Sequence, residues 1–97
     1  MLRISASEQV RNWLQGLSTD IRRRVRQDLR ALAAGRGGSL DVKALRRELE
    51  GFYRLRVADY RIVYHLEAGP GILLDYADIR DTVYDAFRVL RGLREEP

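Results

Sequence analysis

Hydrophobic positions at the start of the chain follow a strand period and then a helix period. Alternation over residues 2 to 6 predicts a short strand, with Leu2 and Ile4 on the same side. Ser7 is a favourable residue for a helix start. Residues at i, i+3, i+4 and i+7 then form one apolar helix face, which ends near Gly16: Val10, Trp13, Leu14 and Leu17. At this spacing Trp13 is expected to be a core residue.

A second amphipathic helix is predicted from Ser18 or Thr19 to Gly35. Asp20 lies in its first turn, where a carboxylate complements the helix dipole. The expected inward residues are Ile21, Val25, Leu29 and Leu32. The expected outward residues are Arg22, Arg23, Arg26 and Arg30. Because only a short turn joins the two helices, they should form an antiparallel helical hairpin.

The second half of the chain changes to β-branched and aromatic residues. Residues 52–57 and 60–66 predict a β-hairpin around Ala58 and Asp59, and residues 72–80 predict a third strand. A final helix is expected from Asp81 or Thr82, burying Val83, Ala86, Phe87 and Leu90. Residues 35–39 are typical of a loop, and residues 42–50 have no clear type.

The predicted element order is β-α-α-β-β-β-α, which is typical of an α+β protein. We expect one domain over residues 1–97, with a small, twisted, mainly antiparallel sheet packed against the helical hairpin and the helices on one face.

Composition excludes several classes of function. The chain has no cysteine and one histidine, so we expect no disulfide, no metal site and no cofactor held by such ligands. Its apolar runs are far too short to cross a bilayer, and no secretory signal is evident, which favours a cytoplasmic protein. The net charge of +4 favours a polyanionic partner, although arginine-rich composition can also reflect the genome.

Strand alternation gathers arginines on one face of the hairpin. With a two-residue turn, Arg56 pairs with Arg61, and Arg54 lies on the same face. Like charges opposite each other are unfavourable, so an anionic ligand is expected between them. Arg80, at the end of the third strand, could reach the same hollow. The alternative is pairing of these arginines inside the protein with one of several acids: Glu48, Glu50, Asp75 or Asp78.

The hairpin sequence Tyr53-Arg54-Leu55-Arg56-Val57-Ala58-Asp59-Tyr60-Arg61, followed by Arg80 and Val83-Tyr84, resembles the RelE/ParE superfamily of bacterial toxins, the RelE branch above all. The resemblance covers about residues 45–84. It implies a toxin of a toxin–antitoxin pair that cleaves mRNA on the ribosome without a metal ion. It also implies a cognate antitoxin as partner, in a possible hetero-oligomer. The resemblance places the catalytic set on Arg54, Arg56, Arg61, Arg80 and Tyr84.

The sequence departs from the family at the two basic positions of the first hairpin strand. Lysine stands there in well-known members, whereas this chain has Arg54 and Arg56. Arginine stabilises phosphate charge well but is a poor general base, because it stays protonated. The sequence leaves the base open among Tyr84, His65 and the carboxylates of Glu48 or Glu50.

Two alternative functions remain open at this point. A ParE-like toxin would poison DNA gyrase through protein contacts and cut nothing. A non-cleaving relative would only bind RNA. The basic set on the hairpin favours the endoribonuclease.

Overall fold

The computed structural model describes residues 2–79 and 82–95. Along the chain the elements are β1 (Arg3–Ala6), α1 (Glu8–Gln15), α2 (Thr19–Ala33), β2 (Asp41–Ala44), β3 (Phe52–Val57), β4 (Tyr60–Glu67), β5 (Gly71–Ile79) and α3 (Thr82–Glu95). Two short 3-10 turns, η1 (Gly37–Ser39) and η2 (Arg47–Leu49), flank β2. The predicted helices and the predicted hairpin are therefore present with nearly the expected bounds.

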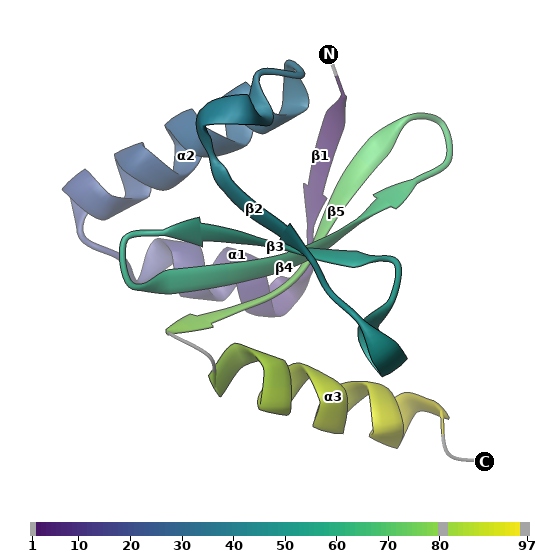
Figure 1. Cartoon of the computed structure of the whole chain (residues 1–97). Coiled ribbons are helices and arrows are strands. Elements are labelled where there is room, and N and C mark those ends of the chain that lie inside the picture. The colour runs from purple at the N-terminus through teal and green to yellow at the C-terminus, as the bar shows by residue number, and fades with distance from the viewer. Residues whose placement is uncertain (1, 80–81, 96–97) are drawn as a thin grey trace.

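The strands of the described residues form one five-stranded sheet in the order β1-β5-β4-β3-β2 (Figure 1). Among these pairs only β1–β5 is parallel. The remaining pairs are antiparallel. The edge strand β2 was not assigned from sequence. It has four residues, of which only Val42 is apolar and half-buried, so it carries little strand pattern.

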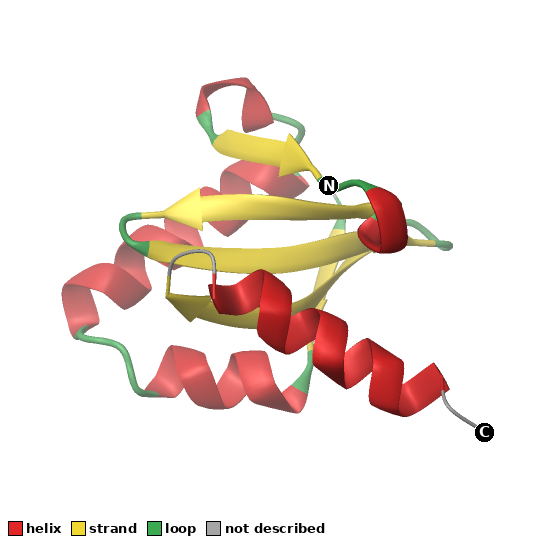
Figure 2. Cartoon of the chain, turned by 60° about the horizontal axis from the view of Figure 1, so that its bottom comes forward, coloured by secondary structure: helices red, strands yellow, loops and turns green. Residues whose placement is uncertain are grey.

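Helices cover both faces of the sheet, which corrects the expectation that they share one face. The hairpin α1–α2 packs on the face that carries Leu55, Val57 and Ile62. The opposite face carries Val63, and α3 covers it with Val83 and Phe87. Figure 2 shows α3 in front of the sheet and the other two helices behind it. Leu90, expected to be buried, is 38% exposed, because α3 continues beyond the sheet surface that it covers.

Local side-chain contacts explain where the first two helices begin. The Ser7 hydroxyl accepts a hydrogen bond from the Val10 N–H at 3.2 Å, and the Ser18 hydroxyl accepts one from the Ile21 N–H at 3.4 Å. Such N-caps satisfy backbone donors that the helix leaves open. Trp13 packs against the core, and its ring meets the Tyr60 ring edge-on at 5.5 Å.

The predicted hairpin register is confirmed residue by residue. Phe52 lies opposite His65, Arg54 opposite Val63, Arg56 opposite Arg61 and Val57 opposite Tyr60. Ala58 adopts a φ of 54° in the turn, the left-handed conformation that tight hairpins require.

A register shift between β4 and β5 changes which residues face α3. The shift lies between Val63 and Tyr64, and it leaves Asp75 as an extra residue in β5. As a result the Asp75 carboxylate reaches Nδ1 of His65 at 2.7 Å.

The far half of β5 is held in place by a glutamine of α1. The Gln9 amide donates to the Ala77 carbonyl at 2.7 Å and accepts from the Ala77 N–H at 2.9 Å. It therefore replaces a neighbouring strand where β1 has already ended. This contact fixes the β5 segment that includes Asp78.

None of the helices formed by the described residues has the length and apolar character needed to cross a membrane.

Candidate RNA-binding site

Four charged residues form a row across the sheet on the face that α3 partly covers. From β2 to β5 the successive register partners are Asp41, Arg56, Arg61 and Asp78. Residues directly opposite each other in neighbouring strands point to the same face. The two arginines are thus brought together as predicted, with an aspartate at each end of the row. We call these four residues the charged row.

Arg54 is held inside the protein by an acid that sequence reasoning did not consider. Its Nη2 lies 2.6 Å from Oδ1 of Asp41, and its side chain is only 13% exposed. A charge-assisted hydrogen bond of this length fixes the guanidinium. Arg54 therefore supports the site from within and is less available to a ligand than its neighbours.

Among the predicted arginines that the structure describes, Arg56 is the most exposed. It is exposed, and its Nε donates to the Ala58 carbonyl at 3.2 Å. It forms no ion pair with another described residue. Together with Arg24, Asp41 and Asp59 it lines an open cavity of about 340 Å³ at the hairpin tip.

The remaining predicted site residues are Arg61, Arg80 and Tyr84, which lie in different parts of the chain. Arg61 is half-buried between Arg56 and Asp78. Arg80 lies outside the described residues. Tyr84 is half-buried in α3, packs against the cluster around Val63 and Phe87, and faces a groove toward β2. Tyr84 is thus placed beside the edge strand.

Sequence reasoning missed a basic groove between α3 and the segment from β2 to η2. The groove has a volume of about 510 Å³, and its lining includes Lys43, Arg46, Arg47, Leu49, Tyr84 and Arg88. We call it the α3 groove. Four basic residues at positions 43, 46, 47 and 88 were visible in the sequence, but without assigning β2 there was no basis for grouping them.

Two of the candidate general bases are engaged in structural contacts. His65 contacts the Asp75 carboxylate, and its ring lies edge-on to the Phe52 ring with 5.2 Å between the ring centroids. These contacts give His65 a structural role. Glu48 lies 2.6 Å from Nε of Arg88. A backbone hydrogen bond, with added help from Arg88 and Arg47, lowers the pKa of Glu48 below its ordinary value. A carboxylate with a lowered pKa is a weak proton acceptor at neutral pH.

No group of three or more metal-ligating side chains occurs within residues 2–79 and 82–95.

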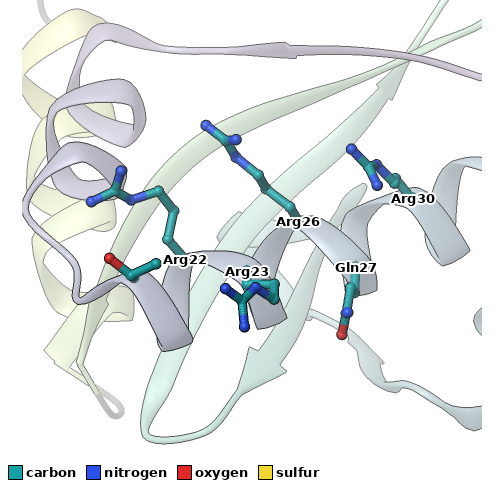
Figure 3. Close-up of a pocket in the computed structure, with 6 residues that line it drawn as sticks. Arg22, Arg23, Arg26, Gln27 and Arg30 are labelled. Carbon is teal, nitrogen blue, oxygen red and sulfur yellow. The ribbon is translucent and has the colours of Figure 1, made fainter.

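A second basic concavity follows α2, on the hairpin side of the sheet. It has a volume of about 430 Å³ and is lined mainly by arginines. Figure 3 shows Arg26 and Arg30 extending to one side of the helix, and Arg23 and Gln27 to the other. Arg22 donates to the Leu17 carbonyl at 3.0 Å and is tied to the start of its own helix. Of the predicted catalytic residues, the four that the structure describes do not line this concavity.

The fold is shared with solved toxin structures. The RelB–RelE antitoxin–toxin complex from Methanococcus jannaschii matches with a TM-score of 0.67 and 21% identity, over 90% of this chain and 99% of that chain. A YoeB/ParE toxin from Agrobacterium tumefaciens matches with a TM-score of 0.69 and 13% identity, over 81% and 99%. At such identities the likeness shows the fold.

One match also has appreciable sequence identity. The archaeal RelE–RelB complex from Pyrococcus horikoshii matches with a TM-score of 0.68 and 26% identity, over 82% of this chain and 96% of that chain. No protein-family model and no curated protein matches the chain. The fold is that of the RelE and YoeB toxins. These structural neighbours, the complex with 26% identity among them, support the RelE/ParE-like toxin superfamily for this chain.

Proposed function

We propose that this protein is the toxin of a toxin–antitoxin pair and that it cleaves messenger RNA on the ribosome without a metal ion. The observation that carries the proposal is the pairing of Arg56 with Arg61 in the middle of the charged row. Two guanidinium groups placed opposite each other repel, and a bound phosphate would relieve that repulsion.

The proposed reaction uses the substrate's own 2′-hydroxyl as nucleophile. The 2′-hydroxyl loses its proton as its oxygen attacks the neighbouring phosphorus, the bond from phosphorus to the 5′-oxygen breaks, and the 5′-oxygen takes up a proton. A 2′,3′-cyclic phosphate and a 5′-hydroxyl result. Arg56 and Arg61 would stabilise the extra negative charge on the phosphoryl oxygens in the transition state. Arg54 would hold the strand geometry through Asp41. Arg80 and Tyr84 complete the set that the resemblance implies.

Partner and location follow from the same proposal. Two of the solved structures with this fold are complexes of RelE with the antitoxin RelB, so we propose a cognate antitoxin for this chain. A toxin that acts on translated mRNA would work in the cytoplasm.

The test is primer extension on translated mRNA after the protein is induced in cells. We expect discrete cuts at the ribosomal A site with the unaltered protein, and at least a 100-fold loss of cutting with Arg56→Ala, because one charge contact to the transition state is worth about 2.7–4 kcal/mol. Arg3→Ala is the matched control. Arg3 is an exposed arginine on β1, at the opposite edge of the sheet from β2.

Other results would assign a different function. DNA damage without mRNA cuts would favour a gyrase poison. RNA binding without cuts or DNA damage would favour a non-cleaving relative.

A further inference from the structure

One arginine of α2 lies at the cavity at the hairpin tip. The cavity has a volume of about 340 Å³ and is lined by Arg56, Ala58 and Asp59 of the hairpin, Asp41 of β2 and Arg24 of α2. Figure 1 shows the first half of α2 beside the hairpin turn. Arg24 therefore shares a cavity with Arg56, although α2 packs on the opposite face of the sheet.

Two features of the fold bring Arg24 to this place. Val25 is fully buried in the same core as Val57 of β3, which holds the helix backbone close to that strand. The ladder between β2 and β3 begins with the pair Asp41 and Arg56 and does not extend to Val57. The side chain of Arg24 reaches the cavity across this end of the ladder.

Arg24 is separated from the other arginines of α2. An α-helix turns by about 100° per residue, so Arg24 and Arg26 point about 160° apart. The concavity along α2 is lined by Arg22, Arg23, Arg26 and Arg30, but not by Arg24. Of the five arginines on this helix, one therefore faces the hairpin tip.

The charge of Arg24 is not used within the described part of the protein. Its side chain is exposed and forms no hydrogen bond or ion pair with another residue that the structure describes. Asp41, which lines the same cavity, is already paired with Arg54 at 2.6 Å. Asp59 is exposed at the turn and also lacks an ion pair among the described residues. The cavity thus has two guanidinium groups without an acidic partner and one such carboxylate, which leaves an excess of positive charge.

The position of Arg24 continues the line of positive charge that begins at Arg61. On the sheet, Arg56 has Arg61 as its neighbour on one side and Asp41 on the other. Arg24 approaches Arg56 from the side of Asp41. An RNA strand whose scissile phosphate lies between Arg56 and Arg61 would therefore bring a neighbouring phosphate to Arg24, and guanidinium groups bind phosphate oxygens in a bidentate manner.

We propose that Arg24 binds the phosphate next to the scissile phosphate and is a substrate-binding residue outside the set that the resemblance implies. The proposal rests on the proposed nuclease function for the position of the scissile phosphate. Because the neighbouring phosphate takes no part in bond breaking, its contact with Arg24 is equally strong in the ground state and in the transition state. The contact therefore raises the affinity for RNA and leaves kcat unchanged. The carboxylate of Asp59 in the same cavity opposes this binding.

Binding of a fluorescent single-stranded RNA with 2′-O-methyl groups tests the contact, because such RNA lacks the nucleophile and stays intact. We expect Arg24→Ala to weaken binding about tenfold and to reduce the slope of log K against log salt by about 0.7. Arg26→Ala is the matched control. It removes the same charge from an exposed position on the other flank of the same helix and should bind RNA nearly as the unaltered protein does.

Two further variants separate the bidentate contact from charge alone. Arg24→Lys keeps the charge and should keep the salt dependence, but it should lose part of the affinity because an ammonium group cannot bind a phosphate in the same planar geometry. Asp59→Asn should strengthen binding, because one negative charge leaves the cavity. Both residues are exposed, so the melting temperatures should stay close to that of the unaltered protein.

Cleavage of mRNA on purified ribosomes separates the neighbouring phosphate from the scissile one. Arg24→Ala should raise KM about tenfold and leave kcat unchanged, whereas Arg56→Ala should lower kcat. A loss of kcat in Arg24→Ala with an unchanged KM would place Arg24 at the scissile phosphate and overturn the proposal.

The outcomes distinguish the Arg24 contact from the proposed nuclease. Equal losses of RNA binding in Arg24→Ala and Arg26→Ala would show an effect of net charge and overturn the contact. Unchanged RNA binding in Arg24→Ala would also overturn it, and so would an unaltered protein that binds no RNA. If Arg24→Ala binds RNA normally but no longer binds an antitoxin, an acidic protein partner replaces RNA at this position. An unaltered protein that binds RNA through Arg24 but cuts no mRNA would overturn the nuclease and leave the contact standing.

Discussion

Arg54 and Arg56 lie two residues apart on the same face of β3, yet their surroundings differ. Arg54 is 13% exposed and ion-paired with Asp41, whereas Arg56 is exposed and bonded only to the Ala58 carbonyl. The chemistry of a guanidinium is the same in both places. Its availability to a phosphate depends on whether an acid of a neighbouring strand already forms an ion pair with it.

Removing the acid should change both stability and RNA binding. Asp41→Asn breaks the ion pair with Arg54. Because the Asp41 side chain is 52% exposed, water screens this pair, and we expect a loss of only about 1 kcal/mol in the free energy of unfolding. RNA affinity should increase, because one negative charge leaves the charged row. Urea unfolding and RNA titration measure the two effects. Glu67→Gln, an exposed acid at the end of β4, should change neither; equal effects in both variants would show a net-charge effect only.

Tyr64 should make the protein sensitive to alkaline pH. Burial, with a smaller contribution from Tyr53, raises the pKa of Tyr64 above its ordinary value of 10.0. Above about pH 10 the unfolded chain therefore loses this proton while the folded chain keeps it, and the free energy of unfolding falls as the pH rises.

Comparison of stability curves between pH 8 and about pH 11 checks this expectation. Tyr64→Phe cannot ionise and should lose less stability over that range than the unaltered protein. Tyr53→Phe keeps the buried Tyr64 hydroxyl and should still decline. Parallel curves for the unaltered protein and Tyr64→Phe would show that Tyr64 does not titrate differently in the two states.

At the level of secondary-structure elements, the alternation of apolar and polar residues was sufficient to predict the β3–β4 hairpin but not β2. In β3 the apolar residues and the arginines alternate strictly, and β4 keeps the same alternation except at the buried Val63, so the register and the pairing of Arg56 with Arg61 were predictable. β2 is a short edge strand with only Val42 half-buried, and its pairing with β3 depends on contacts distant in sequence. Lys43 and Asp41 could therefore not be placed beside Arg54 and Arg56 from the sequence.

The turn between η2 and β3 depends on the backbone of Gly51. Its φ is +94°, and no heavy atom lies within 4 Å of the position that a Cβ would occupy. Gly51→Ala should therefore destabilise the protein by about 1 kcal/mol through backbone strain alone. Chemical unfolding measures this. Gly38→Ala is the matched control, because its surroundings are equally open and its φ is not in the left-handed region. Equal stability of the two variants would exclude a backbone cost at Gly51.

At the scale of the whole molecule, the sheet separates two cores of unequal size. In the described part of the chain, eleven buried residues lie in the core under α1 and α2, and four lie in the core under α3. Of α3, Val83 and Phe87 are buried, whereas Val89 is 61% exposed. Elements with few buried apolar contacts open at lower free energy than the rest of the fold.

Native-state hydrogen exchange should show this difference. We expect α3 amides to exchange through openings of lower free energy than α2 amides. Val83→Ala should lower the α3 opening free energy by about 2 kcal/mol and leave α2 unchanged. Val25→Ala, an equally buried valine of α2, should lower protection throughout the protein. A uniform loss in both variants would show that the two layers unfold together.

The helical hairpin, the β3–β4 register and the position of Arg56 opposite Arg61 could all be predicted from the sequence. These features depend on the period of hydrophobic residues, on Ser caps and on a two-residue turn, which act between near neighbours in the chain. Three features became visible only in the folded protein: α3 covers the opposite face of the sheet, Asp41 forms an ion pair with Arg54, and one groove is bordered by Lys43, Arg46, Arg47 and Tyr84. Those contacts join segments far apart in sequence, and no local periodicity encodes which of them meet.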